Sequence, residues 1–345
     1  MGRRLGLVSG VALVTLFATA AFADGITLKI QVSDRSGDEV YKVQSEEWNP
    51  MLEKMTGGRL KTELFTMDAV VPYKETVPAM VAGILDGHIT SMEYHSGLNP
   101  AFALMGNLVA GYANADQQQS FCFIGPGAEL SQKLYDATFG KGKVHVVGCA
   151  TYMNEAFVAK VPLRGVADLK GKKLRAPEGL VSEVFRRAGA ATVSLPTTEV
   201  YTSLEKGVVD GADMASYTNN RTNGLHRVAP YPLFPGIHSV TVHVFAVSQK
   251  KWDSLTPDLQ ATLGVWWHYL YDMKRRYNEI RDLELAAEDR SGKGEKVEII
   301  DWSPEERAKF REIAKGAWVD FANKNALAKE VYDENVKFMK RLGLL

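Results

Sequence analysis

Apolar and polar positions alternate in two short stretches near the start of the chain, residues 26–32 and 60–65. Every second residue of 26–32 is apolar, and Leu60 and Leu64 lie on one face of 60–65, which is the period of a β-strand with one buried face. Residues 40–55 between them follow a helical pattern that stops at Gly57-Gly58. The order strand, helix, strand predicts an α/β layer rather than an all-helical or all-β domain.

The same patterns predict further elements along the chain. They are helices over 74–85 (ending near Gly87) and 180–188, strands over 144–147, 156–161 and 192–195, a polar loop over 151–155, a short strand that Pro177 ends, and a helix opening at Pro196-Thr197-Thr198-Glu199. A hydroxyl residue before a helix caps its first amide groups, and Ser303 with Glu306 has the spacing of a capping box.

Residues 257–289 predict one long helix after Thr256-Pro257. Its early part carries an apolar stripe that includes Trp266 and Trp267. A helix of this length exceeds what one small domain needs to cover. The sequence leaves two interpretations open, a brace between two lobes and a contact between subunits.

The N-terminus has the organisation of a secretory signal peptide. Arg3 and Arg4 precede an apolar run over 5–20 and the small-residue site Ala21-Phe22-Ala23. We therefore expect residues 1–23 to be removed and the protein to be exported to the periplasm. The alternative is an uncleaved anchor, although this apolar run is shorter than a usual membrane span.

Charge excludes one class of partner. The chain has 41 basic and 41 acidic residues, and loss of Arg3 and Arg4 leaves a mature net charge of about −2. This balance argues against a protein that binds nucleic acid. Cys122 and Cys149 are the two cysteines, and the sequence leaves open whether they form a disulfide or remain buried thiols.

Catalytic motifs are missing. The chain has no Gly-x-Ser-x-Gly elbow, no phosphate-binding loop, no His-Glu-x-x-His helix and no dinucleotide fingerprint after a strand. Its seven histidines are scattered. We expect no enzyme, and a secreted hydrolase is the remote alternative.

Two segments carry the most specific pattern, residues 168–177 (DLKGKKLRAP) and 195–211 (LPTTEVYTSLEKGVVDG). Together they resemble the solute-binding proteins of tripartite ATP-independent periplasmic (TRAP) transporters, in the dicarboxylate-binding-subunit family. Residues 81–87 and 252–255 are similar to other segments of that family. The resemblance extends over most of the mature chain.

The resemblance implies a two-lobed periplasmic binding protein of the Venus-flytrap fold, α/β in class, with the long C-terminal helix as a brace. We expect lobe one to comprise 24–151 with about 240–275, and lobe two to comprise 152–239 with about 276–345. The lobes would close on a small organic acid, a 2-oxo, 2-hydroxy or sugar acid, which membrane permease subunits then transport. A sulfonate ligand and a sensory binding protein that feeds a receptor are the alternatives.

Arg175 is the ligand contact that the resemblance implies, because the family's arginine in this segment grips the carboxylate of the solute. The physical reason is independent of the family: a planar guanidinium presents two parallel N–H donors to a carboxylate. Arg175 also lies where a strand breaks, and α/β folds place ligand crevices at strand ends. The alternative is an arginine that pairs with Glu178 or Asp168 to hold a loop.

Further contacts are expected from the same comparison. Asn154 can donate and accept hydrogen bonds, whereas Glu155 would accept from a hydroxyl or ammonium, help to hold a cation, or simply face solvent. Asp213 and Met214 follow the second motif, and Asp213 is the candidate ligand of a bridging Na⁺ or Ca²⁺. No cofactor is expected to be required. Tyr94 and His238 are further cleft candidates, with core packing as the alternative for each, and the long helix is the candidate homodimer contact.

Overall fold

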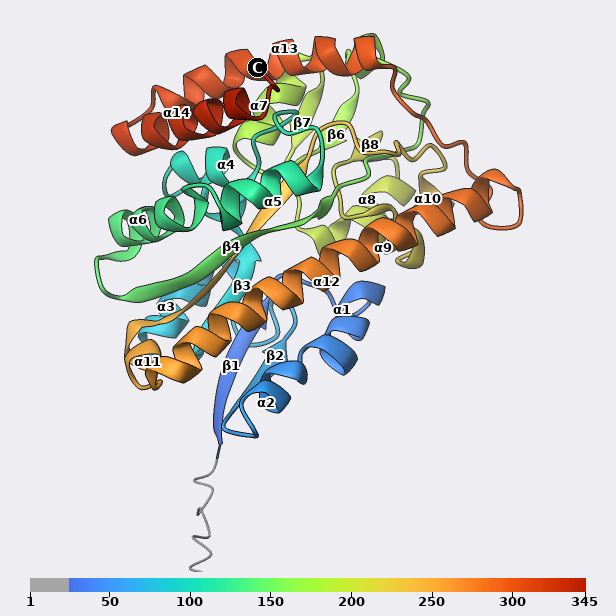
Figure 1. Ribbon diagram of the computed structural model, residues 1–345. Coiled ribbons are helices and arrows are strands. Elements are labelled where there is room, and N and C mark those ends of the chain that lie inside the picture. Colours follow the sequence, from blue (N-terminus) through green and yellow to red (C-terminus); the bar gives the residue numbers. More distant parts are fainter. Residues whose placement is uncertain (1–24) are drawn as a thin grey trace, which may run out of the picture.

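The computed structural model describes residues 25–345, so the predicted signal peptide lies outside the described residues. Two β-sheets form the framework (Figure 1). The first has the order β2-β1-β3-β9-β4, with bounds Leu60–Phe65, Ile26–Val32, Gly87–Ser91, Val240–Ser248 and Val144–Asn154. The second has the order β5-β8-β6-β7, with bounds Val158–Ala159, Gly211–Ala212, Lys173–Arg175 and Ala191–Val193. The predicted α/β class is confirmed.

Helices surround both sheets. The α-helices are α1 (Glu39–Val43), α2 (Met51–Met55), α3 (Thr76–Val81), α4 (Ala101–Gly106), α5 (Ala115–Phe123), α6 (Gly127–Phe139), α7 (Leu180–Arg187), α8 (Val200–Glu205), α9 (Tyr217–Thr222), α10 (Leu225–Val228), α11 (Gln249–Asp253), α12 (Pro257–Arg290), α13 (Pro304–Ala322) and α14 (Ala326–Arg341). Short helical turns are η1 (Gln44–Trp48), η2 (Tyr73–Glu75), η3 (Met92–His95), η4 (Val166–Leu169) and η5 (Thr197–Glu199). None of the helices among residues 25–345 combines the length and apolar character that a membrane crossing needs.

Strand β4 corrects the prediction of a polar loop over 151–155. The strand continues to Asn154, and Thr151, Tyr152 and Met153 are buried within it. The Thr151 amide donates to the Gln119 side chain at 2.6 Å, so a helix outside the sheet satisfies a polar group of this strand. Tertiary partners of this kind cannot be read from a local polar pattern.

Two predicted helices are also shorter or interrupted. The helix expected over 40–55 is divided into α1, η1 and α2, with Pro50 directly before α2. The helix expected over 74–85 consists of η2 and α3 and ends at Val81. Proline lacks the amide hydrogen that a continuous helix needs, which accounts for the break between η1 and α2.

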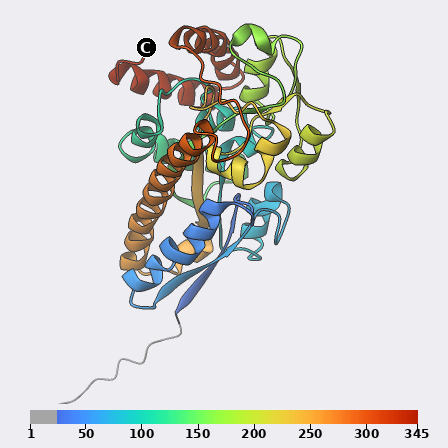
Figure 2. The same cartoon turned by 90° about the vertical axis from the view of Figure 1, so that its right-hand side faces the viewer.

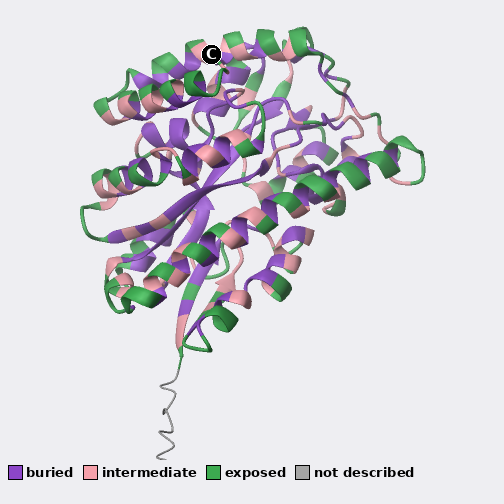
Figure 3. Ribbon diagram, viewed as in Figure 1, coloured by how far each residue is buried: buried purple, intermediate pink, exposed green. Residues whose placement is uncertain are grey.

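Helix α12 runs along the first sheet and on to the region of α9 (Figures 1 and 2). It packs against β4, α2 and α9. Trp266, Trp267 and Tyr271 are fully buried in its interface with the first sheet, and the burial pattern along the helix is visible in Figure 3. The helix therefore contacts elements beside both sheets.

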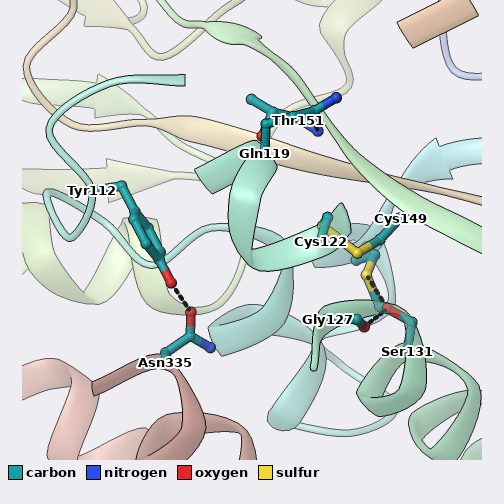
Figure 4. Close-up of a disulfide and its surroundings, with 9 residues drawn as sticks. Tyr112, Gln119, Cys122, Gly127, Ser131, Cys149, Thr151 and Asn335 are labelled. Carbon is teal, nitrogen blue, oxygen red and sulfur yellow. Dashed lines mark hydrogen bonds between the residues drawn. A yellow bond between two sulfur atoms is a disulfide. The ribbon is translucent and has the colours of Figure 1, made fainter. Parts of the chain in front are cut away.

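A disulfide joins Cys122 of α5 to Cys149 of β4, which resolves the alternative left open for the two cysteines (Figure 4). It encloses a chain segment with a sequence separation of 27. The hydrogen bond from Thr151 to Gln119 lies beside it and connects the same two elements. Helix α5 is thus held to β4 by a covalent bond and by a hydrogen bond.

Each sheet is built from particular segments of the chain, which can be compared with the predicted lobe boundaries. Strands from residues 26–154 and 240–248 build the first sheet, and strands from 158–212 build the second. Helices α13 and α14 pack together, α13 against α7 and α14 against α4. The division into 24–151 with 240–275 and 152–239 with 276–345 stays a prediction.

Candidate functional site

Arg175 is the last residue of β6, and Pro177 follows it. Its side chain is buried, with 5% of the residue exposed. Nε donates to the carbonyl of Leu195 at 3.1 Å and Nη1 donates to the carbonyl of Asp213 at 2.6 Å. Two main-chain oxygens from the flanking segments therefore fix the orientation of the guanidinium.

No carboxylate of residues 25–345 forms an ion pair with Arg175. Glu178, one of the two proposed partners, lies 3.8 Å from Lys74, and Asp168 accepts a hydrogen bond from the Arg164 amide instead. A buried charge without a charged partner is costly. The guanidinium retains donors for an external anion.

Two cavities meet at Arg175, one of about 240 Å³ and one of about 50 Å³. Five residues line both of them: Glu93, Tyr94, Arg175, Pro177 and Thr197. The larger cavity continues between the loops at 67–74 and 194–198. The smaller one continues toward Tyr152, Glu155, Asp213, Met214 and His243.

Glu155, Asp213 and His238 form a compact cluster next to the smaller cavity, with one ligand atom from each lying within 4.8 Å of the others. His238 Nε2 donates to Asp213 Oδ1 at 2.7 Å and lies 4.0 Å from Glu155 Oε2. Glu155 Oε2 and Asp213 Oδ2 are buried and have no hydrogen-bond partner. Two carboxylate oxygens are thus available for a positively charged group.

The environments of the acids separate their pKa values. Burial raises the pKa of Glu155 well above its usual range, and the nearby carboxylates of Asp213 and Glu93 raise it further. Burial also acts to raise the pKa of Asp213, but His238 and Arg175 outweigh it and the pKa is lowered. Burial and neighbouring acids therefore dominate at Glu155, whereas at Asp213 the adjacent His238 side chain is the main lowering cause and Arg175 adds to it.

Glu93 is a site residue that the sequence reasoning missed. It lies in η3, directly after β3, and is 6% exposed. Asn107 Nδ2 donates to its Oε2 at 3.3 Å. Burial and the Asp213 carboxylate raise the pKa of Glu93 to about 7. Its position after a strand and beside Tyr94 was the available signal.

The structure brings most of the predicted site residues together. Tyr94 lines both cavities, whereas Glu155, Asp213 and Met214 line the smaller one. His238 lies behind Asp213 and lines a separate cavity of about 430 Å³. Asn154 lines that separate cavity and another of about 170 Å³, but neither of the two that contain Arg175. Asn154 is the last residue of β4 and Glu155 follows the strand, and the two side chains line different cavities.

The donor set fits a hard cation. Carboxylate oxygens are the ligands that Na⁺ and Ca²⁺ prefer, and Glu155 Oε2 and Asp213 Oδ2 lack other partners. His238 orients Asp213 through its other oxygen, as second partners of metal-binding carboxylates commonly do. These residues would hold the ion, and it would supply a positive charge between the acids and the solute.

Two sheets beside a cavity that contains a buried guanidinium without an ion-pair partner among residues 25–345 favour a protein that binds an anionic solute. The family model of the bacterial extracellular solute-binding proteins, family 7, matches residues 33–325. The chain belongs to this family, and it is a TRAP-type solute-binding protein.

Individual relatives agree with this assignment. A monocarboxylate 2-oxoacid-binding periplasmic protein of Nostoc sp. is 28% identical over 296 residues, which cover 84% of this chain and 78% of the relative. The apo open crystal structure of a TRAP periplasmic solute-binding protein from Rhodobacter sphaeroides is 39% identical, has a TM-score of 0.75 and covers 92% of this chain and 99% of its own.

A third relative shows the same fold at low identity. It is a TRAP solute-binding protein from Bordetella bronchiseptica, a dimer crystallised with copurified calcium and picolinate in one active site. It is 20% identical, has a TM-score of 0.79 and covers 93% of this chain and 94% of its own. The two-lobed binding-protein fold expected from the sequence is confirmed by these structures.

Proposed function

We propose that this protein captures a small organic acid in the periplasm and delivers it to the membrane subunits of a TRAP transporter, without catalysis. The buried guanidinium of Arg175, held by two carbonyls and free of any carboxylate partner among residues 25–345, is the observation that supports this function. Its remaining donors can bind one carboxylate of the solute.

The surroundings of Arg175 favour a solute with a single carboxylate. Glu93, Glu155 and Asp213 lie on the other walls of the same cavities. A second carboxylate on the solute would be buried among these acids at a high electrostatic cost. Two other cations line these cavities, but Lys74 lies 3.8 Å from Glu178 and Arg35 lies 3.0 Å from Asp38. We therefore propose a 2-oxo, 2-hydroxy or sugar acid rather than a dicarboxylate.

A cation is part of the proposed binding mode. Na⁺ or Ca²⁺ held by Glu155 and Asp213 would compensate the acids and contact the solute carboxylate or its neighbouring oxygen. The relative from Bordetella bronchiseptica carries calcium together with picolinate, a monocarboxylate. Our chain offers two unpaired carboxylate oxygens for the same purpose.

The experiment is a thermal-shift titration of the mature protein with a panel of carboxylates and one sulfonate, with and without CaCl₂ or NaCl. A solute that binds only the folded state raises the apparent melting temperature. We expect a shift with at least one monocarboxylate, larger when the cation is present. If no carboxylate raises the melting temperature, the proposed capture of an organic acid is wrong. If only the sulfonate raises it, the protein binds sulfonates instead. Turnover of a bound acid, followed by NMR, would contradict a non-catalytic role.

We also propose a homodimer through α12. Val265, Ile280 and Leu283 on this helix are 60%, 60% and 57% exposed, and the Bordetella bronchiseptica relative is a dimer. Light scattering on the mature protein tests this, and Ile280→Glu should convert a dimer into a monomer. A monomeric wild type at high micromolar concentration contradicts the proposal.

A further inference from the structure

The larger cavity offers more room and more polar groups than one short acid uses. Its volume of about 240 Å³ far exceeds the roughly 10–15 Å³ that one water molecule needs on the same measure. Arg175 lies where this cavity meets the smaller one, so a carboxylate on Arg175 leaves the space between the loops at 67–74 and 194–198 to the rest of the solute. A three-carbon acid would leave most of this space to water.

Hydroxyl groups line the cavity beyond Arg175. Tyr73, Tyr94 and Thr198 line the cavity, and their hydroxyls form no hydrogen bond to another group within residues 25–345. The rings of Tyr73 and Tyr94 lie 4.9 Å apart and form one wall. Each hydroxyl can donate or accept, so this part of the cavity suits a solute with several hydroxyls of its own.

Carboxylates line the same cavity on two sides. Glu93 lies at its junction with the smaller cavity, and Asp68 lies in the first loop. Asp68 accepts from the Tyr73 amide through Oδ1 at 2.7 Å, and Oδ2 has no partner within the described chain. Its φ of +61° is uncommon for a residue other than glycine, and such conformations concentrate where ligands are held.

We propose that the solute is a polyhydroxylated monocarboxylate, a sugar acid such as an aldonate or a uronate, with its carboxylate on Arg175 and its hydroxyls on Glu93, Asp68 and Thr198. This inference rests on the proposed function and narrows its solute class. Hydroxyls of a sugar donate to carboxylates, and the adjacent hydroxyl groups of the protein satisfy the oxygens that remain.

Other solute classes fit these walls less well. An alkyl tail would cover Glu93 and Asp68 without replacing their hydrogen bonds to water, which is unfavourable. A second carboxylate would face the same two acids, and Lys74, the other cation of this cavity besides Arg175, already lies 3.8 Å from Glu178. A short 2-oxo acid presents only acceptors, so it offers no hydroxyl that could donate to the Asp68 carboxylate.

The first test is calorimetric titration of the mature protein, in buffer with CaCl₂, with gluconate, galacturonate, lactate, pyruvate, hexanoate and succinate. We expect at least one of the two sugar acids to bind ten or more times tighter than lactate, with hexanoate no tighter than lactate. The inference is overturned if lactate or pyruvate binds as tightly as both sugar acids. That result would leave the proposed function intact, whereas the absence of binding by every acid would reject the proposed function itself.

The second test uses Asp68→Asn and Thr198→Val, with Asp258→Asn as the matched control. Asparagine tolerates the backbone conformation of Asp68, and Asp258 is an exposed acid that pairs with Arg59 away from the cavities. We expect each cavity variant to weaken the sugar acid about tenfold and to change lactate binding less than twofold, while the control changes neither. Equal affinity of both cavity variants and wild type for the sugar acid overturns the inference.

Discussion

Lys274 Nζ lies 2.7 and 2.8 Å from the two carboxylate oxygens of Asp34, and both side chains are fully buried. Tyr152 donates to the same carboxylate at 2.8 Å, and Lys274 Nζ lies 4.6 Å from the centre of the Tyr152 ring. Asp34 follows β1, whereas Lys274 belongs to α12. The pair joins the long helix to the first sheet beneath Tyr152, a wall of the smaller cavity.

Removal of one partner should destabilise the protein strongly. Lys274→Met leaves the Asp34 carboxylate buried without compensation, which costs about 3–5 kcal/mol in comparable cases. Urea unfolding monitored by tryptophan fluorescence measures the change, with exposed Lys329→Met as the control. The double variant Asp34→Asn with Lys274→Met should cost less than Lys274→Met alone. A loss below about 1 kcal/mol for the single variant would show that the pair is dispensable.

Arg175→Lys should abolish tight binding while the fold is retained. An ammonium cannot present two parallel donors to a carboxylate, and it cannot keep both carbonyl contacts. We expect affinity for the solute to fall by at least tenfold in calorimetry, since a charged hydrogen bond is worth about 1.5–3 kcal/mol. Arg59→Lys, at an exposed ion pair, is the control. Equal affinity in the two variants would remove Arg175 from the binding role.

The disulfide should contribute measurable stability. Its loop, with a sequence separation of 27, corresponds to about 3–4 kcal/mol in the chain-entropy model. The double variant Cys122→Ser with Cys149→Ser should lower the free energy of unfolding by this amount. Wild type in excess dithiothreitol should approach the variant. If reduction leaves the urea midpoint unchanged, the disulfide does not stabilise the fold.

Asp282 should make stability fall as the pH rises. Burial raises its pKa to about 7, although Thr218 donates to it through its amide at 2.7 Å and its hydroxyl at 2.6 Å. The unfolded value is about 3.9, so the folded state holds the proton more tightly. The contribution of Asp282 to the free energy of unfolding is complete below pH 4. It declines between pH 4 and pH 7 by about 1.4 kcal/mol per pH unit.

Asp282→Asn keeps the shape of the protonated acid and removes this titration. The variant should match wild type near pH 4 and exceed it at pH 7 in urea unfolding. Glu279→Gln, on the exposed face of the same helix, controls for a change of charge on α12. A stability difference that is constant between pH 4 and 7 would contradict the assignment of this dependence to Asp282.

The local sequence pattern was sufficient to predict those helices and strands that depend mainly on their own residues. Strands β1 and β2 lie where alternation predicts them, and α12 spans Pro257–Arg290 against the predicted 257–289. Ser303 caps α13, since its hydroxyl accepts from the Glu306 amide at 3.3 Å. The Glu306 side chain, however, accepts from the distant Val166 amide at 2.7 Å. Such a partner depends on the fold.

The site shows the same division between local and distant information. The motif at 168–177 and its position at the end of a strand were enough to predict Arg175 as a ligand contact. Glu93 was missed because its role depends on Asp213 and Arg175, which β3, β6 and β8 bring together from distant parts of the chain. Asn154 and Glu155 are adjacent in sequence, yet only Glu155 lines a cavity with Arg175. Strand β4 extends farther than its polar residues indicated, which is why the two were not distinguished.

Main-chain carbonyls, not side chains, fix the position of the Arg175 guanidinium. Leu195 and Asp213 supply main-chain oxygens, and any amino acid at these positions would supply the same atoms. Side chains around the arginine can therefore change during evolution without displacing it. Substitutions of residues on the opposite cavity walls can therefore change which solute is bound, while Arg175 keeps its position as the carboxylate contact.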